Sequence, residues 1–292
     1  MLTSRQEKIL QLIVDEYVKS VNPVGSKLIC DELNCSSATV RNEMSVLEDL
    51  GYLEKTHVSS GRIPSEVGYR YYVDNLMEPK KMNGDDLLKL QLIFNNNKLD
   101  MPDVIKKSLA IISELTDYTS VVHRNITISG VSIEEVQKTV ELINKLLIGT
   151  PIDEINKKLE FEVKPIINQY VMQHEIIYNA FYNVFSDMVS KNDMSFVGKT
   201  NILNQPEFNN VEKIKNLLNK FEDSSLFESI EEDDNDINIY IGKESKLDDD
   251  VTVIKTKYKT DTDEGTIAVI GPKRMEYDRV VSLLSYIKEH LK

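Results

Sequence analysis

The sequence has only two cysteines, Cys30 and Cys35, among its 292 residues. Two cysteines are too few for a disulfide framework, and we expect a cytoplasmic protein. They suit small core or turn positions, with a redox sensor as the alternative. No apolar run reaches 18 residues, so we expect no membrane span. The four histidines are scattered and form no metal spacing with the cysteines, so we expect neither metal nor cofactor.

Glycine-rich loops that cradle phosphates are also missing. None of the 11 glycines forms a Gly-x-Gly pair, which excludes a dinucleotide-binding loop. Gly198, Lys199 and Thr200 match the end of a P-loop. Asp193 stands where that loop needs its first glycine, so nucleotide hydrolysis is disfavoured. We therefore expect a protein that is not an enzyme.

Positive charge is scarce, since the formal net charge is −13. Residues 222–250 hold twelve acids and two lysines, and residues 1–77 hold eight Lys and Arg against eleven Asp and Glu. Any contact with nucleic acid must therefore depend on a local basic face. The acidic run at 231–234 is typical of a solvated loop. Alternatively, it repels DNA from this part of the protein or binds a chaperone.

The first 77 residues carry the pattern of a winged helix-turn-helix. Thr3 with Gln6 and Ser4 with Glu7 both fit a capping box before a helix that ends near Pro23. We expect Ser26 to cap a second helix and Ser36 or Ser37 to cap a third that stops at Gly51. A hairpin over 52–64 and a helix over 65–77 follow.

The third helix has one apolar and one polar side at a spacing of about 100° per residue. Val40, Met44 and Leu47 are expected to face inward, and Ala38, Arg41, Asn42 and Ser45 outward. Arginine can read guanine and asparagine adenine in a major groove, while a helix N-terminus suits a phosphate. A winged helix that binds another protein is the alternative. The candidate DNA-binding residues are Lys27, Ser36, Ser37, Thr39, Arg41, Asn42, Ser45, Lys55, His57, Ser59, Ser60, Gly61 and Arg62.

The rest of the chain alternates between helical and strand patterns, so the expected class is α+β and mostly helical. Helices are predicted over 85–95, 102–116, 132–148, 165–190, 211–221 and 277–291, and strands over 119–123, 126–131, 237–241, 251–254 and 266–270. The helix at 165–190 is either ordinary core or a dimer interface. Its candidate interface residues are Tyr170, Ile177, Phe181 and Phe185.

Several segments resemble the HrcA family, the heat-inducible transcription repressors of bacteria. They are LTSRQEKILQLIVDEYV, SSATVRNEM, SGRIPSEVGYRYYVD, GKTNILNQPEF, IYIGKES and EGTIAVIGPKRMEYDRV. The resemblance implies a winged helix at 1–78, a GAF-like domain at 79–157 and 237–292, and an inserted dimerisation domain at 158–236. It also implies a homodimer that binds an inverted-repeat operator (CIRCE) before chaperone genes and needs the chaperonin GroEL to stay active.

The sequence departs from the family pattern in its middle, where strands before the helix at 132–148 are missing. Glycines usual in the family at 256–264 are replaced by Lys and Asp. We therefore expect a reduced GAF-like domain. Two alternatives to a chaperonin-controlled repressor stay open: a regulator gated by a metabolite in the GAF-like domain, and an interaction module that does not bind DNA.

Overall fold

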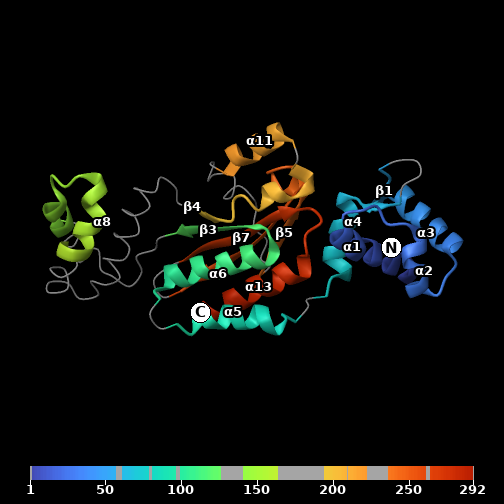
Figure 1. Cartoon of the computed structure of the whole chain (residues 1–292), viewed down its shortest axis with the longest axis horizontal. Coiled ribbons are helices and arrows are strands. Elements are labelled where there is room, and N and C mark those ends of the chain that lie inside the picture. Colours follow the sequence, from blue (N-terminus) through green and yellow to red (C-terminus); the bar gives the residue numbers. More distant parts are fainter. Residues whose placement is uncertain are drawn as a thin grey trace.

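The structure is a computed structural model that describes residues 2–56, 61–78, 81–96, 99–125, 141–163, 194–208, 210–221, 236–260 and 264–291. Figure 1 shows the N-terminal helices at one end of the longest axis, a sheet covered by helices in the middle, and α8 (Ile155–Lys158) at the other end. None of the described helices combines the length and the apolar character needed to cross a membrane.

The N-terminal end is a winged helix fold. Its elements are α1 (Ser4–Ser20), α2 (Ser26–Leu33), α3 (Ser37–Asp49), β1 (Leu53–Glu54), β2 (Ile63–Pro64), α4 (Glu66–Tyr71) and the π-helical turn η1 (Tyr72–Leu76). The predicted capping box is confirmed, because the Gln6 N–H donates to the Thr3 hydroxyl at 3.3 Å and the Thr3 N–H donates to Gln6 Oε1 at 2.9 Å. Gly51 follows α3 at φ +82°, as a left-handed helix stop requires.

One helix cap differs from prediction. Gly25, not Ser26, is the N-cap of α2, and the Ser26 hydroxyl instead lies 2.8 Å from that of Ser37 in α3. The expected helix over 65–77 is present: Ser65 is its N-cap, and its second half, η1, is π-helical. The hydroxyls of Tyr71 and Tyr72 each donate to a carboxylate of α1, Glu7 at 2.7 Å and Asp15 at 3.1 Å.

A five-stranded antiparallel sheet forms the centre, in the order β4-β3-β7-β6-β5. The strands are β3 (Thr119–Asn125), β4 (Met194–Val197), β5 (Asn238–Ile241), β6 (Val251–Lys259) and β7 (Glu264–Pro272). The other described elements are α5 (Gly84–Phe94), α6 (Met101–Thr116), η2 (Ile152–Glu154), η3 (Leu159–Val163), η4 (Ile202–Asn204), η5 (Pro206–Phe208), α11 (Val211–Phe221), η6 (Gly242–Ser245) and α13 (Tyr277–His290). The predicted helix at 165–190 and strand at 126–131 lie outside the described residues.

Helices cover both faces of this sheet, because successive strand residues point to opposite sides. On one face Val122, Ile254 and Val269 join a core with α6 and α13, which Figure 1 shows lying across the sheet. On the other face Val121, Val253 and Ile270 form a second core with η4, η5 and α11. The range 158–236, predicted to be an inserted domain, includes β4 and α11. The structure pairs β4 with β3 and packs α11 on the same sheet.

The winged helix and the sheet domain share one continuous core. The rings of Tyr69 and Tyr72 lie 6.0 and 6.5 Å from the ring of Tyr277 at the start of α13. The Arg70 guanidinium donates to the Ile239 carbonyl at 2.6 Å and pairs with Glu244. These contacts fix how the winged helix is held against β5 and α13.

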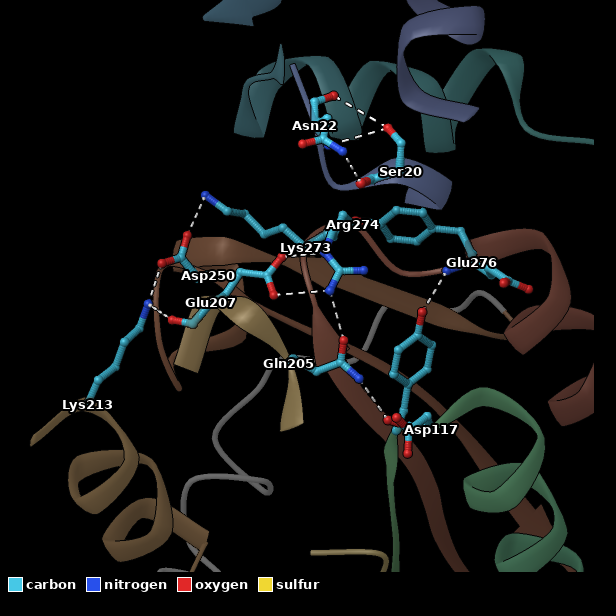
Figure 2. A network of polar contacts seen from close by, with 12 residues as sticks. Ser20, Asn22, Asp117, Gln205, Glu207, Lys213, Asp250, Lys273, Arg274 and Glu276 are labelled. Carbon is cyan, nitrogen blue, oxygen red and sulfur yellow. Dashed lines mark hydrogen bonds and ion pairs between the residues drawn. The ribbon is translucent and has the colours of Figure 1, made fainter. Parts of the chain in front are cut away.

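A buried polar network joins two of the segments that carry the family resemblance, NQPEF and IGPKRMEY. Arg274 donates to Glu207 at 2.5 and 3.3 Å and to Gln205 at 2.8 Å, as Figure 2 shows. The Gln205 amide in turn donates to the Asp117 carbonyl at 3.1 Å. Burial, with a further contribution from the Glu207 carboxylate, raises the pKa of Tyr17 in the last turn of α1.

Three further ion pairs extend this network toward α11. Lys213 pairs with Asp250 and lies 3.3 Å from Asp248, and Lys273 lies 3.3 Å from Asp250. Burial disfavours the charged Asp250 carboxylate, but Lys213 and Lys273 outweigh that effect and lower the pKa of Asp250. Together the two groups of contacts tie α11 and η5 to the loop between β7 and α13.

Candidate DNA-binding surface

The orientation of α3 is set by its buried side. Val40, Met44 and Leu47 are at most 3% exposed and belong to the shared core, as the sequence predicts. Truncating such a buried leucine costs about 2–5 kcal/mol, so rotation of the helix about its axis is strongly opposed. The opposite side of α3 is therefore held toward solvent.

That solvent side carries the residues predicted for base contacts. Ala38, Arg41, Asn42 and Ser45 are all exposed. Within the described residues, neither Arg41 nor Asn42 has a hydrogen bond or ion pair in its side chain. Their donors and acceptors are available to a partner, and the helix that presents them is slim enough for a major groove.

The N-terminal turn of α3 is capped by one hydroxyl. Ser36 is the N-cap, and its hydroxyl accepts from the Thr39 N–H at 3.1 Å and lies 2.9 Å from the Thr39 hydroxyl. Ser37 directs its hydroxyl to Ser26, away from solvent. Backbone N–H groups of a first helical turn have no intrahelical partner, and the dipole there favours an anion. This end of α3 therefore suits a phosphate through Ser36 and the backbone, and not through Ser37.

The wing is joined to the start of α2. Arg62 and Val24 exchange two backbone hydrogen bonds of 2.8 and 2.9 Å. A Cβ on Gly61 would lie only 2.4 Å from the Val24 carbonyl oxygen, so the chain needs glycine at this crossing. His57, Ser59 and Ser60 of the predicted surface lie outside the described residues.

The Arg62 side chain, which we expected at a phosphate or in a minor groove, lies against α3. Its Nε and Nη2 are both 2.7 Å from Glu48 Oε2, and its side chain is 12% exposed. Lys55, the other predicted cation of the wing, lies 3.4 Å from Glu48 Oε1. The ion pairs of Glu48 with Arg62 and Lys55 were not predicted from the sequence. The only sequence feature that indicated them was an acidic residue near the end of α3, followed by a hairpin with two cations.

Lys27 is the remaining predicted cation. It is exposed in the first turn of α2, and its ammonium has no partner in the part of the chain that the structure describes. Arg41 and Lys27 can therefore contact DNA directly, whereas Lys55 and Arg62 form ion pairs with Glu48.

The remaining sequence candidates add no described residue to this surface. Tyr170, Ile177, Phe181 and Phe185 lie outside the described residues. Gly198 turns the chain after β4 at φ +67°, where a Cβ would lie 2.0 Å from Ser113 Oγ, which explains the P-loop-like segment as a tight turn. The described residues contain no group of three or more His, Cys, Asp or Glu able to hold a metal.

Family models match both parts of the chain. The winged helix-turn-helix transcription repressor, HrcA DNA-binding model matches residues 1–71, and the HrcA protein C-terminal domain model matches residues 115–281.

The chain is also similar to curated proteins named heat-inducible transcription repressor HrcA. The one from Lysinibacillus sphaericus is 38% identical, over 99% of this chain and 96% of that protein. Those from Bacillus pumilus (strain SAFR-032) and Listeria monocytogenes serotype 4a (strain HCC23) are 34% identical, over 100% of this chain and 97% and 96% of theirs. A crystal structure described as that of a hypothetical protein has a TM-score of 0.70 at 23% identity, over 100% of this chain and 98% of that one, and shows the fold alone.

Proposed function

The chain belongs to the HrcA family, and we propose that it represses heat-inducible chaperone operons by binding their regulatory DNA. The single observation that supports this most is the exposed pair Arg41 and Asn42 on a helix whose other side is buried. A negatively charged protein needs such a local surface to meet DNA, because its bulk charge repels the phosphates.

In the proposed complex α3 lies in the major groove. Arg41 donates to a guanine edge and Asn42 bonds an adenine, and each good bidentate contact discriminates by about 1–3 kcal/mol. Ser36 and the first backbone N–H groups of α3 meet a phosphate, and Lys27 meets another. Bound protein then excludes RNA polymerase from the promoter.

A homodimer places two such helices on the two halves of the inverted repeat CIRCE. Half-sites that face the same side of the duplex are separated by whole helical turns, so two-fold protein symmetry matches an inverted repeat. We propose that residues in the range 158–236 supply the dimer contacts and that the sheet domain is the reduced GAF-like domain. In this proposal the protein works in the cytoplasm, and GroEL sustains its repressor activity.

A metabolite-gated regulator is the second candidate function, because a cavity of about 360 Å³ lies where the winged helix meets α13. Its lining includes Val18, Tyr72, Met82, Met275 and Arg279, so both parts of the protein contribute to it. Thermal unfolding with a metabolite panel separates the two candidates: only gating by a metabolite predicts a raised midpoint.

Titration of an operator duplex and a scrambled duplex by gel shift tests the proposal. Wild-type protein should bind the operator much more tightly, and Arg41→Ala should lose about 1–3 kcal/mol of operator binding free energy. Arg5→Ala is the matched control, since Arg5 is an exposed arginine of the same domain that lies 3.7 Å from Glu43. Equal binding of both duplexes by the wild type would refute sequence-specific repression.

A further inference from the structure

One carboxylate on α3 binds both described cations of the wing. Glu48 Oε2 accepts from two nitrogens of Arg62 at 2.7 Å, and Glu48 Oε1 lies 3.4 Å from the Lys55 ammonium. Both oxygens of the carboxylate are therefore used. The exposed fractions of the Arg62, Glu48 and Lys55 side chains are 12%, 26% and 40%, so solvent and ions reach the pair from the Lys55 side.

Glu48 lies on the flank of the DNA-facing side of α3. It follows Arg41 by seven residues, which in an α-helix returns to within about 20° of the same direction, about 10 Å further along the axis. The position of Arg62 is fixed independently, because its backbone is bonded to Val24. A duplex that contacts Arg41 therefore brings its backbone near the Glu48 cluster.

A phosphate at this position competes with Glu48 for the same donors. Arginine and lysine bind carboxylates and phosphates through the same N–H groups. While Glu48 holds them, the two cations contribute little to attraction by an arbitrary duplex, and the Glu48 charge repels its phosphates. Non-specific affinity depends on how many phosphates the protein neutralises, so it is lowered.

We propose that Glu48 is a specificity-determining residue that withholds Arg62 and Lys55 from non-specific DNA. In an operator complex Arg41 and Asn42 contact base edges, so the duplex is held against α3 and can displace the carboxylate. An unrelated duplex lacks those base contacts and meets two cations that are already bound to Glu48. The inference rests on the proposed DNA-binding function and adds to it a residue that tunes the ratio of specific to non-specific affinity.

Glu48→Gln tests the inference, with Asp49→Asn as the matched control. Asp49 is an exposed neighbour on the same helix and has no hydrogen bond or ion pair among the described residues. Both substitutions remove one negative charge, but only Glu48→Gln removes a partner of Arg62 and Lys55. Affinity for a scrambled duplex is measured from 50 to 200 mM salt. At 50 mM salt, Glu48→Gln should raise the affinity for the scrambled duplex about tenfold. The slope of log affinity against log salt concentration should become steeper by about 1 to 2, as expected for one or two added phosphate contacts. Asp49→Asn should leave the slope unchanged.

The gain should also depend on Arg62. In the double variant Glu48→Gln/Arg62→Gln most of the increase in scrambled-DNA affinity should disappear. Weaker binding of scrambled DNA by Glu48→Gln, or the same salt slope as Asp49→Asn, overturns the inference. Thermal unfolding confirms that each variant is folded.

A second comparison covers the case in which Glu48→Gln does not fold. Lys55→Gln changes a side chain that is 40% exposed and should alter scrambled-DNA affinity less than about twofold. Lys27→Gln removes a cation that has no partner among the described residues and should reduce the affinity more. Equal losses from the two variants overturn the inference. Failure of the wild type to prefer operator DNA is a separate result, which refutes the proposed function itself.

Discussion

Replacing Arg274 by methionine should destabilise the sheet domain strongly. Its guanidinium makes three hydrogen bonds to Glu207 and Gln205, and its side chain is 10% exposed. Methionine keeps much of the aliphatic length but removes every donor. The Glu207 carboxylate then stays largely buried without its counter-charge, and the side-chain amide oxygen of Gln205 loses its donor.

The size of the effect follows from that orphaned charge. Removing one partner of a buried ion pair typically costs about 3–5 kcal/mol of unfolding free energy, whereas replacing both partners by uncharged groups is often close to neutral. Arg274→Met should therefore cost about 3–5 kcal/mol, and the double variant Arg274→Met/Glu207→Leu clearly less.

Urea unfolding followed by circular dichroism measures both changes. Lys273→Met is the matched control, because the neighbouring Lys273 is 26% exposed and pairs with Asp250 at 3.3 Å. A partly exposed pair of this kind contributes about 0–1 kcal/mol. A loss below 1 kcal/mol for Arg274→Met, or a loss equal to that of Lys273→Met, would refute the reasoning about burial.

Three further predictions concern the winged helix. Ser36→Ala removes the α3 cap and should lower the unfolding free energy by about 1 kcal/mol in urea titrations. The hydrogen bond to Glu7 raises the pKa of Tyr71 to about 12. Tyrosine in an unfolded chain has a pKa near 10, so this hydrogen bond stabilises the folded state fully below about pH 10, and the stabilisation is lost as pH rises through 12. Tyr71→Phe should remove that part of the pH dependence of the urea midpoint. Arg70→Met removes the contacts of the winged helix with Ile239 and Glu244 and should speed tryptic cleavage after Lys81, as read by mass spectrometry. An unchanged cleavage rate would contradict the role of these contacts in holding the winged helix against the sheet domain.

The sequence was sufficient for features that depend on neighbouring residues. The capping box of Thr3 and the left-handed stop at Gly51 involve contacts within one helical turn, and both are confirmed. The inward side of α3 was predicted correctly because Val40, Met44 and Leu47 share one side of any helix, whatever packs against it.

Features that depend on distant segments could not be predicted. The pairing of Arg62 with Glu48 depends on the path of the hairpin between them, and Glu207 meets Arg274 only after the chain has returned across the sheet. The strand β4 was missed for the same reason, since its four residues are a strand only through their ladder with β3. In each case the residue type was visible in the sequence but the partner was not.

Hydroxyl-radical footprinting of DNA upstream of chaperonin genes tests most directly whether the exposed side of α3 recognises an operator. Wild-type protein should protect two symmetric half-sites separated by whole helical turns, and Arg41→Ala should lose that protection at the same protein concentration while Arg5→Ala keeps it. Protection that is absent in the wild type, or unchanged in Arg41→Ala, would contradict the account.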